Sequence, residues 1–101
     1  MNVYRPLPPY LTIKQSSVDG LGLFAVEPIK KSINIGISHV KDIHFTNGYI
    51  RTPLGGFINH STTPNCKTFY EGRLISIITI TDIKTGDEIT LNYTMYDPSR
   101  T

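Results

Sequence analysis

What most constrains this chain is how often turn residues interrupt its short runs of alternating apolar and polar residues. Residues 11–15 alternate with the period of a half-buried strand, and residues 74–83 are rich in isoleucine and threonine, which suit a pleated sheet. Glycine and proline between the runs break anything longer. The pattern predicts strands over 11–15, 21–26, 33–38, 57–58, 67–70, 74–83 and 88–93.

Helical signals are almost absent. Residues 39–56 carry the weakest pattern, and residues 39–49 have room for one short helix before Gly48 and Pro53 end it. Residues 71–72 and 84–87 are typical of turns. The sequence therefore predicts an all-β protein, either a small barrel or an assembly of short sheets.

The length allows one small domain. Pro6, Pro8 and Pro9 predict an extended arm over residues 1–10, because proline removes an amide donor and restricts the residue before it. We expect a single domain over 11–97 and a tail over 98–101. A core of this size leaves little stability to spare, so dimerisation would help the protein.

Composition excludes several classes of function. The net charge of +2, without a basic stripe, argues against nucleic acid as a direct partner. Cys66 is the single cysteine, so an internal disulfide and a cysteine-based zinc cluster are excluded, and the three histidines are too scattered to predict a metal site. No apolar run has membrane-spanning length, and the N-terminus lacks a secretion signal. We expect the cytoplasm, or the nucleus of a host if the protein is viral.

A cluster of hydrogen-bonding side chains follows the apolar pair at 57–58. Asn59, His60 and Ser61 can each donate and accept, so at a strand end they are able to hold a polar ligand in one pose. The alternative is an ordinary turn between strands, which asparagine, serine and the following Pro64 also favour. This stretch alone leaves both interpretations open.

Three separated segments share a more specific pattern. They read SVDGLGLFA at 17–25, FINHSTTPN at 57–65 and IKTGDEITLNY at 83–93. In this order they resemble the SET domain of protein-lysine methyltransferases, closest in style to the minimal stand-alone SET proteins of viruses and bacteria. The resemblance extends over about residues 11–97. It implies a fold of several short curved sheets with little helix, in which the C-terminal segment threads under a loop like a knot.

The resemblance implies S-adenosylmethionine as the cofactor. Gly20, Leu21 and Gly22 would contact its methionine part through the backbone, where a missing Cβ permits close approach. The Asn59 side chain would bind its amino-acid end, and the His60 backbone its adenine edge. A bulge or turn is the alternative for the glycines, and a structural histidine is the alternative for His60.

The same resemblance implies a catalytic role for Tyr93 and a structural role for Asn65. Tyr93 would orient the attacking amine and contact the cofactor. Tyr96 would close the cofactor pocket or line the lysine channel, and Phe57 and Phe69 are further channel candidates. Core packing is the alternative for these aromatic residues.

The chain departs from larger SET enzymes in two places. Only residues 39–56 are available for the insert that supplies the peptide groove, and no cysteine-rich segment follows Tyr93. We expect methyl transfer to a lysine of a histone or another basic protein, with a groove that is either shallow or completed by a second subunit. A SET-like module that binds without turnover, and an unrelated small β-barrel interaction domain, are the alternatives.

Overall fold

The computed structural model describes residues 7–18, 20–44 and 48–92. Short strands dominate it, and one helical turn interrupts them, which confirms the all-β prediction. In chain order the elements are β1 (Leu11–Gln15), β2 (Leu21–Ala25), β3 (Asn34–Lys41), β4 (Tyr49–Arg51), α1 (Pro53–Gly56), β5 (Asn59–His60), β6 (Cys66–Glu71), β7 (Leu74–Thr79) and β8 (Thr90–Leu91).

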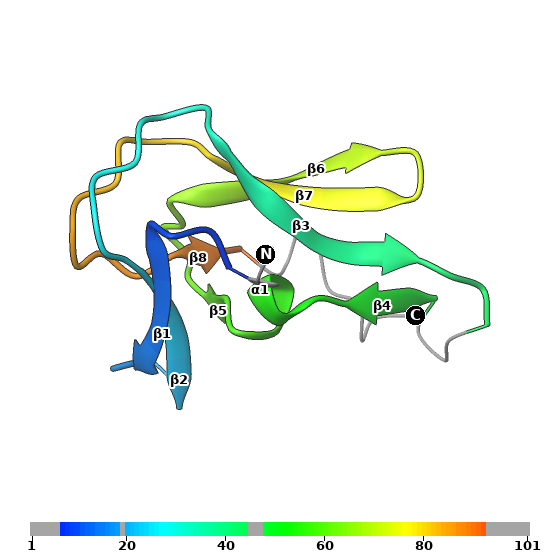
Figure 1. The fold of residues 1–101 in the computed structure, drawn as a ribbon, viewed down its shortest axis with the longest axis horizontal. Helices are drawn as coiled ribbons and strands as arrows, with labels where there is room; N and C mark the ends of the chain where they lie inside the picture. The colour runs from blue at the N-terminus through cyan, green and yellow to red at the C-terminus, as the bar shows by residue number, and fades with distance from the viewer. Residues whose placement is uncertain (1–6, 19, 45–47, 93–101) are drawn as a thin grey trace, which may run out of the picture.

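The strands form three small sheets (Figure 1). β1 and β2 make an antiparallel hairpin, and a four-stranded antiparallel sheet has the order β4-β3-β7-β6. Between them lies a short parallel pair of β5 and β8, which brings Asn59 opposite Thr90 and His60 opposite Leu91. The parallel pair therefore joins the middle of the chain to its C-terminal part.

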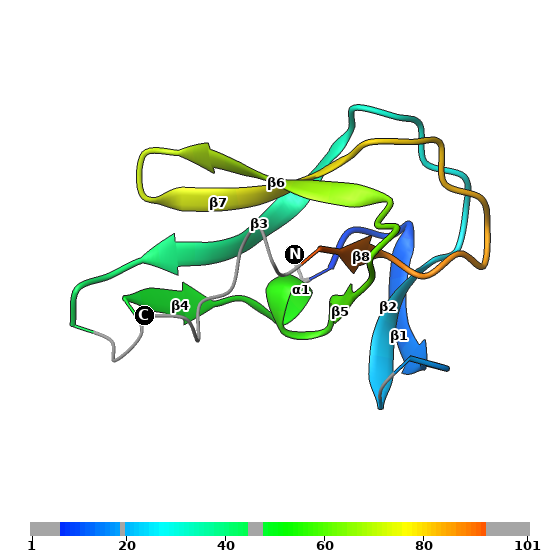
Figure 2. The ribbon, with the colours of Figure 1, turned by 180° about the vertical axis from the view of Figure 1, so that it is seen from behind.

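Two long connections run side by side at the end of the molecule away from β4 (Figures 1 and 2). One follows β2 and the other follows β7. The amides and carbonyls of Ile29 and Ile83 exchange hydrogen bonds of 2.9 and 2.7 Å, and Phe24 forms a bridge with Glu88. These pairings hold the hairpin against the segment that leads to β8.

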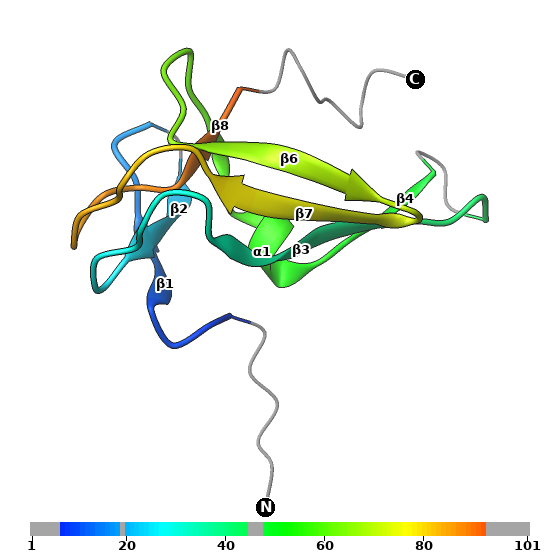
Figure 3. The ribbon, with the colours of Figure 1, turned by 90° about the horizontal axis from the view of Figure 1, so that it is seen from above.

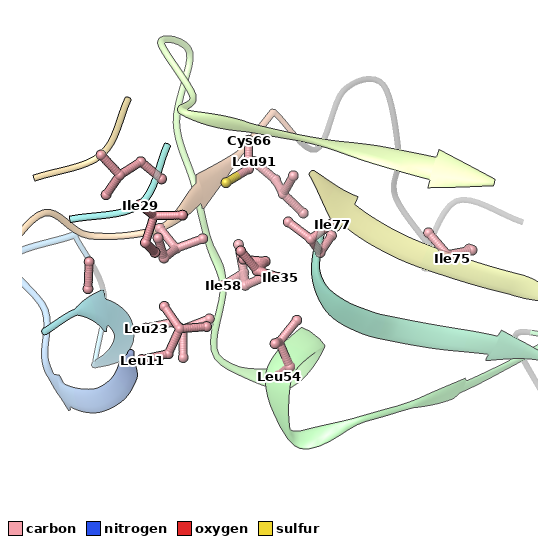
Figure 4. Packing of buried hydrophobic residues seen from close by; sticks show 13 residues of the cluster. Leu11, Leu23, Ile29, Ile35, Leu54, Ile58, Cys66, Ile75, Ile77 and Leu91 are labelled. Carbon is pink, nitrogen blue, oxygen red and sulfur yellow. The ribbon is translucent and has the colours of Figure 1, made fainter. Parts of the chain in front are cut away.

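Aliphatic side chains from every layer meet in one core. Leu11 and Leu23 from the hairpin face Ile35, Ile58 and other aliphatic residues in the space beside the four-stranded sheet (Figure 4). Figure 3 shows that the hairpin and the sheet lie on different sides of this space. The core comprises Leu11, Leu23, Ala25, Ile29, Ile35, Leu54, Ile58, Cys66, Ile75, Ile77, Ile83, Ile89 and Leu91.

The helical turn α1 is built by its cap. Thr52 Oγ1 accepts a 3.2 Å hydrogen bond from the Gly55 amide and donates one of 2.6 Å to the Ile37 carbonyl. Pro53 occupies the first turn, where its missing amide costs nothing. A Cβ on Gly55 would collide with the Ser38 carbonyl, so glycine lets α1 lie directly on β3.

Several predicted boundaries are wrong for physical reasons. The strand predicted over 74–83 ends at Thr79; Ile83 is apolar because it is buried, and it pairs with Ile29 instead. Residues 39–41 continue β3 rather than starting a helix, and residues 57–58 follow α1 as irregular chain. Within 88–92 only Thr90–Leu91 is strand. The knot-like threading falls largely on residues beyond 92, outside the described part.

A buried polar pair lies where β3 meets β7. Ser38 Oγ donates to the Ile75 carbonyl at 3.1 Å and lies 3.0 Å from His39 Nδ1, so the histidine is held as the tautomer that donates from Nδ1. The His39 ring also packs edge-on against Tyr49, with 5.9 Å between ring centroids. Burial, and then the nearby Arg51 charge, lower the His39 pKa from 6.5 to about 4.

Within the described ranges, no helix is long and apolar enough to cross a membrane.

We expect Ile77→Ala to lower the free energy of unfolding by about 3 kcal/mol, because it empties part of a closely packed core. Ile77 is fully buried, whereas its neighbour Ile78 points away from the core and is partly exposed. Ile78→Ala is therefore the matched control and should cost markedly less. Urea unfolding measures both, and equal losses would contradict the described facing of β7.

We also expect stability to depend on His39 in mildly acid solution. Because folding lowers its pKa, the unfolded chain takes up a proton first. The free energy of unfolding should be constant above about pH 7 and should fall as the pH drops from 6.5 towards 4. His39→Gln should lose this part of the slope, while the exposed His44→Gln should retain it. Thermal unfolding across this pH range measures the effect.

Candidate functional site

The three recognisable segments meet at the side chain of Asn59. Its amide nitrogen donates a 2.7 Å hydrogen bond to Glu88 Oε2 and one of 3.3 Å to the Leu21 carbonyl. Leu21 opens β2, Asn59 opens β5, and Glu88 precedes β8. The residues are 29 and 38 positions apart along the chain, so only the fold brings them together.

Glu88 is also anchored from the hairpin. Ser16 Oγ lies 2.8 Å from Glu88 Oε1 and 2.9 Å from Oε2, and donates its proton to this carboxylate. Ser16 Oγ also accepts a hydrogen bond from the Val18 amide, and the Ser16 amide donates one to the Gly20 carbonyl. Ser16, Glu88 and Asn59 therefore form one network, which we call the carboxylate network. The sequence analysis missed Ser16 and Glu88 as site residues.

The two glycines of the first segment serve different purposes. Gly20 has φ of +46°, in the left-handed region, and a Cβ there would meet nothing. The positive φ suits glycine at this position, and the contact of Gly20 with a cofactor stays a prediction. A Cβ on Gly22 would collide with Glu88 Oε2 and crowd Ser16 Cβ. Gly22 is therefore required for the close approach of the Glu88 carboxylate.

The Asn-His-Ser segment contains both a strand and a turn. His60 pairs with Leu91 in the parallel ladder, and the Ser61 amide donates to the Leu91 carbonyl at 2.9 Å. Ser61 Oγ in turn accepts a 3.0 Å hydrogen bond from the Thr63 amide, which is the turn chemistry expected of serine. The polar cluster and the turn are consequently both present, and Ser61 belongs to both.

Asn65 ties this turn to the C-terminal segment, as predicted. Its side-chain nitrogen donates to the Glu88 carbonyl at 2.7 Å, and its side-chain oxygen accepts from the Thr90 amide at 2.9 Å. One amide group thus satisfies backbone groups on both sides of Ile89, a fully buried residue. The hydrogen bond from Asn65 to the Glu88 carbonyl therefore holds the backbone of Glu88 in place.

The aromatic residues predicted to line the lysine channel or the cofactor pocket differ in their burial. Phe57 is half-buried and packs against the core. Phe69 lies on β6 with 43% of its surface exposed. Tyr93 and Tyr96 lie outside the described residues.

A cavity of about 290 Å³ lies beside the end of the described chain. It is largely apolar, and Leu91 and Asn92 contribute to its wall, so it reaches the residue that precedes Tyr93 in sequence. Phe57 and Phe69 are not among its described lining residues, which are Pro64, Cys66, Lys67, Thr68, Ile80, Leu91 and Asn92.

The electrostatics of the carboxylate network favour a cation. The network combines the negative charge of Glu88 with the Leu21 carbonyl, and in the described part of the chain no lysine, arginine or histidine lies within ion-pair distance of this carboxylate. An ammonium or sulfonium group would supply the missing positive charge. The same part of the chain contains no group of three or more His, Cys, Asp or Glu that is able to hold a metal ion.

Comparison with known proteins identifies the class of the protein. The model of the SET-domain family matches residues 38–94, more than half of the chain. The chain therefore belongs to the SET-domain family. No curated protein sequence matches it significantly.

Solved structures show the same fold. A Plasmodium falciparum protein assigned as a histone methyltransferase is 25% identical, with a TM-score of 0.68 over 86% of this chain and 95% of that one. The SET domain of the tumour suppressor RIZ1 is 19% identical, with a TM-score of 0.71 over 91% and 74%. A chain of an active polycomb repressive complex 2 is 21% identical, with a TM-score of 0.68 over 82% of this chain and 15% of its own.

We expect Glu88→Ala to lower the free energy of unfolding by about 2 kcal/mol, because it removes the acceptor of Ser16 Oγ and the nearer of the two acceptors of Asn59 Nδ2. Glu88→Gln should cost less, since its carbonyl oxygen still accepts from Asn59 and its amide donates to Ser16. Chemical unfolding of the two variants measures the difference. Equal stability of Glu88→Ala and the parent protein would contradict the network.

Proposed function

We propose that this SET-domain protein transfers a methyl group from S-adenosylmethionine to the side-chain amine of a lysine in a protein substrate. The observation that carries the proposal is the contact of Asn59 with both Leu21 and Glu88, which unites the three segments in one place. Family membership and the Plasmodium structure support the reaction class.

The chemistry of the carboxylate network fits the cofactor. S-adenosylmethionine carries an ammonium group and a sulfonium group, and both are cations. The Leu21 carbonyl and the Glu88 carboxylate are acceptors suited to the ammonium group, and Asn59 would bind the same amino-acid end. Leu21 itself is 52% exposed, so the proposed site lies at the surface of the protein. Gly20, Gly22 and the His60 backbone complete the proposed cofactor site, with Tyr93 and Tyr96 closing it.

The protein's part in the reaction is positioning and desolvation. The cofactor supplies an activated methyl group, so no metal or covalent intermediate is required of the chain. The target lysine has a pKa of about 10.4 in water and must attack as a neutral amine. A dry channel beside a cation favours loss of its proton. Tyr93 would orient the amine for in-line attack through its hydroxyl group.

The cavity beside Asn92 is a candidate entrance for the lysine. Its wall is largely apolar, as a channel for an aliphatic chain requires, and it ends next to the residue that precedes Tyr93. Phe57, Phe69 and Tyr96 remain further candidates for the lysine channel. A histone tail or another lysine-bearing basic segment is the proposed substrate, in the cytoplasm or a host nucleus.

Labelled methyl transfer tests the proposal. The full chain is incubated with radiolabelled S-adenosylmethionine and core histones, and we expect label on lysine. Tyr93→Phe should lower the rate by roughly 10-fold to 100-fold, because one oriented hydroxyl group is lost from the reacting centre. Tyr10→Phe, which removes a hydroxyl group near the start of β1, is the matched control and should leave the rate unchanged.

Calorimetry with S-adenosylmethionine separates the alternatives. Glu88→Gln keeps the network but removes its charge, so we expect about tenfold weaker binding. Cofactor binding without any methylated product would identify a SET-like binding module. Absence of cofactor binding, together with no transfer to any histone, would refute the proposal.

A further inference from the structure

Strand β6 forms one edge of the four-stranded sheet (Figures 1 and 3). It pairs with β7 through six consecutive residues without a register shift. Among the described residues, its backbone makes no hydrogen bond to any other element. A regular strand with one open edge is a template for pairing with another chain.

The hairpin between β6 and β7 determines which backbone groups face outward. Its turn has two residues, and Gly72 occupies the first position with φ of +59°, as a type II′ turn requires. The pair that closes such a turn, Glu71 with Leu74, exchanges hydrogen bonds, and bonded pairs then alternate along the ladder. The amides and carbonyls of Thr68 and Tyr70 consequently point away from β7.

This edge has neither of two features that commonly protect one, and it is long. It contains no proline and no bulge, and it has six residues where the opposite edge strand β4 has three. Two neighbouring aromatic residues on it, Phe69 and Tyr70, are 43% and 48% exposed. Exposed aromatic residues on a flat edge favour association.

The charges of β6 are complementary to themselves. Lys67 and Glu71 are both exposed and lie two positions on either side of Phe69. We propose that β6 pairs antiparallel with β6 of a second copy of this chain, across a two-fold axis at Phe69. In this register Lys67 lies opposite Glu71 of the partner subunit, twice per dimer.

The backbone agrees with the same register. Thr68 would lie opposite Tyr70 of the partner subunit, so the outward amides and carbonyls of both chains meet and form hydrogen bonds. A shift by two residues in one direction would place Lys67 opposite Arg73 of the partner subunit, which repels it. A shift in the other direction would place Lys67 opposite Phe69 of the partner subunit. Only the register centred on Phe69 pairs both charges.

The dimer would reach the proposed substrate entrance. Thr68 lines the 290 Å³ cavity, and Tyr70 of the partner subunit would stand directly opposite Thr68. A second copy would thus supply an aromatic residue to the rim of this cavity. The pairing itself does not depend on the proposed methyl transfer.

Light scattering after size exclusion tests the pairing on the full chain over a range of concentrations. We expect a concentration-dependent dimer. Lys67→Glu and Glu71→Lys should each weaken it by about tenfold or more, because each creates two like-charged pairs. The double variant Lys67→Glu/Glu71→Lys restores both opposite-charge pairs, and so does an equimolar mixture of the two single variants. Both samples should dimerise like the parent protein.

The control is Lys30→Glu, an equal change of charge on an exposed residue of the connection after β2. It should leave the dimer unchanged. Circular dichroism verifies that every variant folds. A parent protein that is monomeric at all concentrations would overturn the proposal. So would a dimer that resists both single substitutions, or one that neither the double variant nor the mixture restores.

Discussion

The arrangement of this domain depends on one carboxylate held between distant parts of the chain. Glu88 accepts from Ser16 in the hairpin and from Asn59 in β5, while Asn65 binds its backbone carbonyl. A partly buried carboxylate without these donors would be costly. Because the donors are there, the hairpin, the Asn-His-Ser segment and the C-terminal segment are fixed relative to one another, and Gly22 leaves the space that this requires.

Under the proposed function, the carboxylate network and the 290 Å³ cavity would have separate roles. The carboxylate network presents acceptors and negative charge near the start of β2, which suits a cationic cofactor. The 290 Å³ cavity lies beside Asn92, and it is mostly apolar, which suits the carbon chain of a lysine. The parallel pair of β5 and β8 carries residues of both, because Asn59 belongs to the network and Leu91 lines the cavity. In the proposed dimer, the edge of β6 would bring the partner subunit to the rim of this cavity.

Much of the fold was predictable because its signals are local. The alternation at residues 11–15 corresponds to β1 without any error in its bounds, and Gly72 marks the β6–β7 turn. The strand prediction for 80–83 failed because residues 80–82 are exposed, and Ile83, which is buried, forms an isolated bridge with Ile29 instead of continuing β7. The helical turn at Pro53–Gly56 was hidden, since it rests on the Thr52 cap and on contact with β3 rather than on helical periodicity.

The candidate site divides in the same way. From the sequence came the family resemblance, the importance of Asn59 and the structural role of Asn65, because these residues lie in compact motifs with distinctive spacing. The fold alone decided that Gly22 makes room for Glu88 and that Ser16 completes the network, 72 residues away along the chain. Local sequence patterns indicate which residues suit a strand or a turn, because those preferences depend on near neighbours. Which side chains donate hydrogen bonds to the Glu88 carboxylate depends on how the sheets pack, and that is decided only by the tertiary structure.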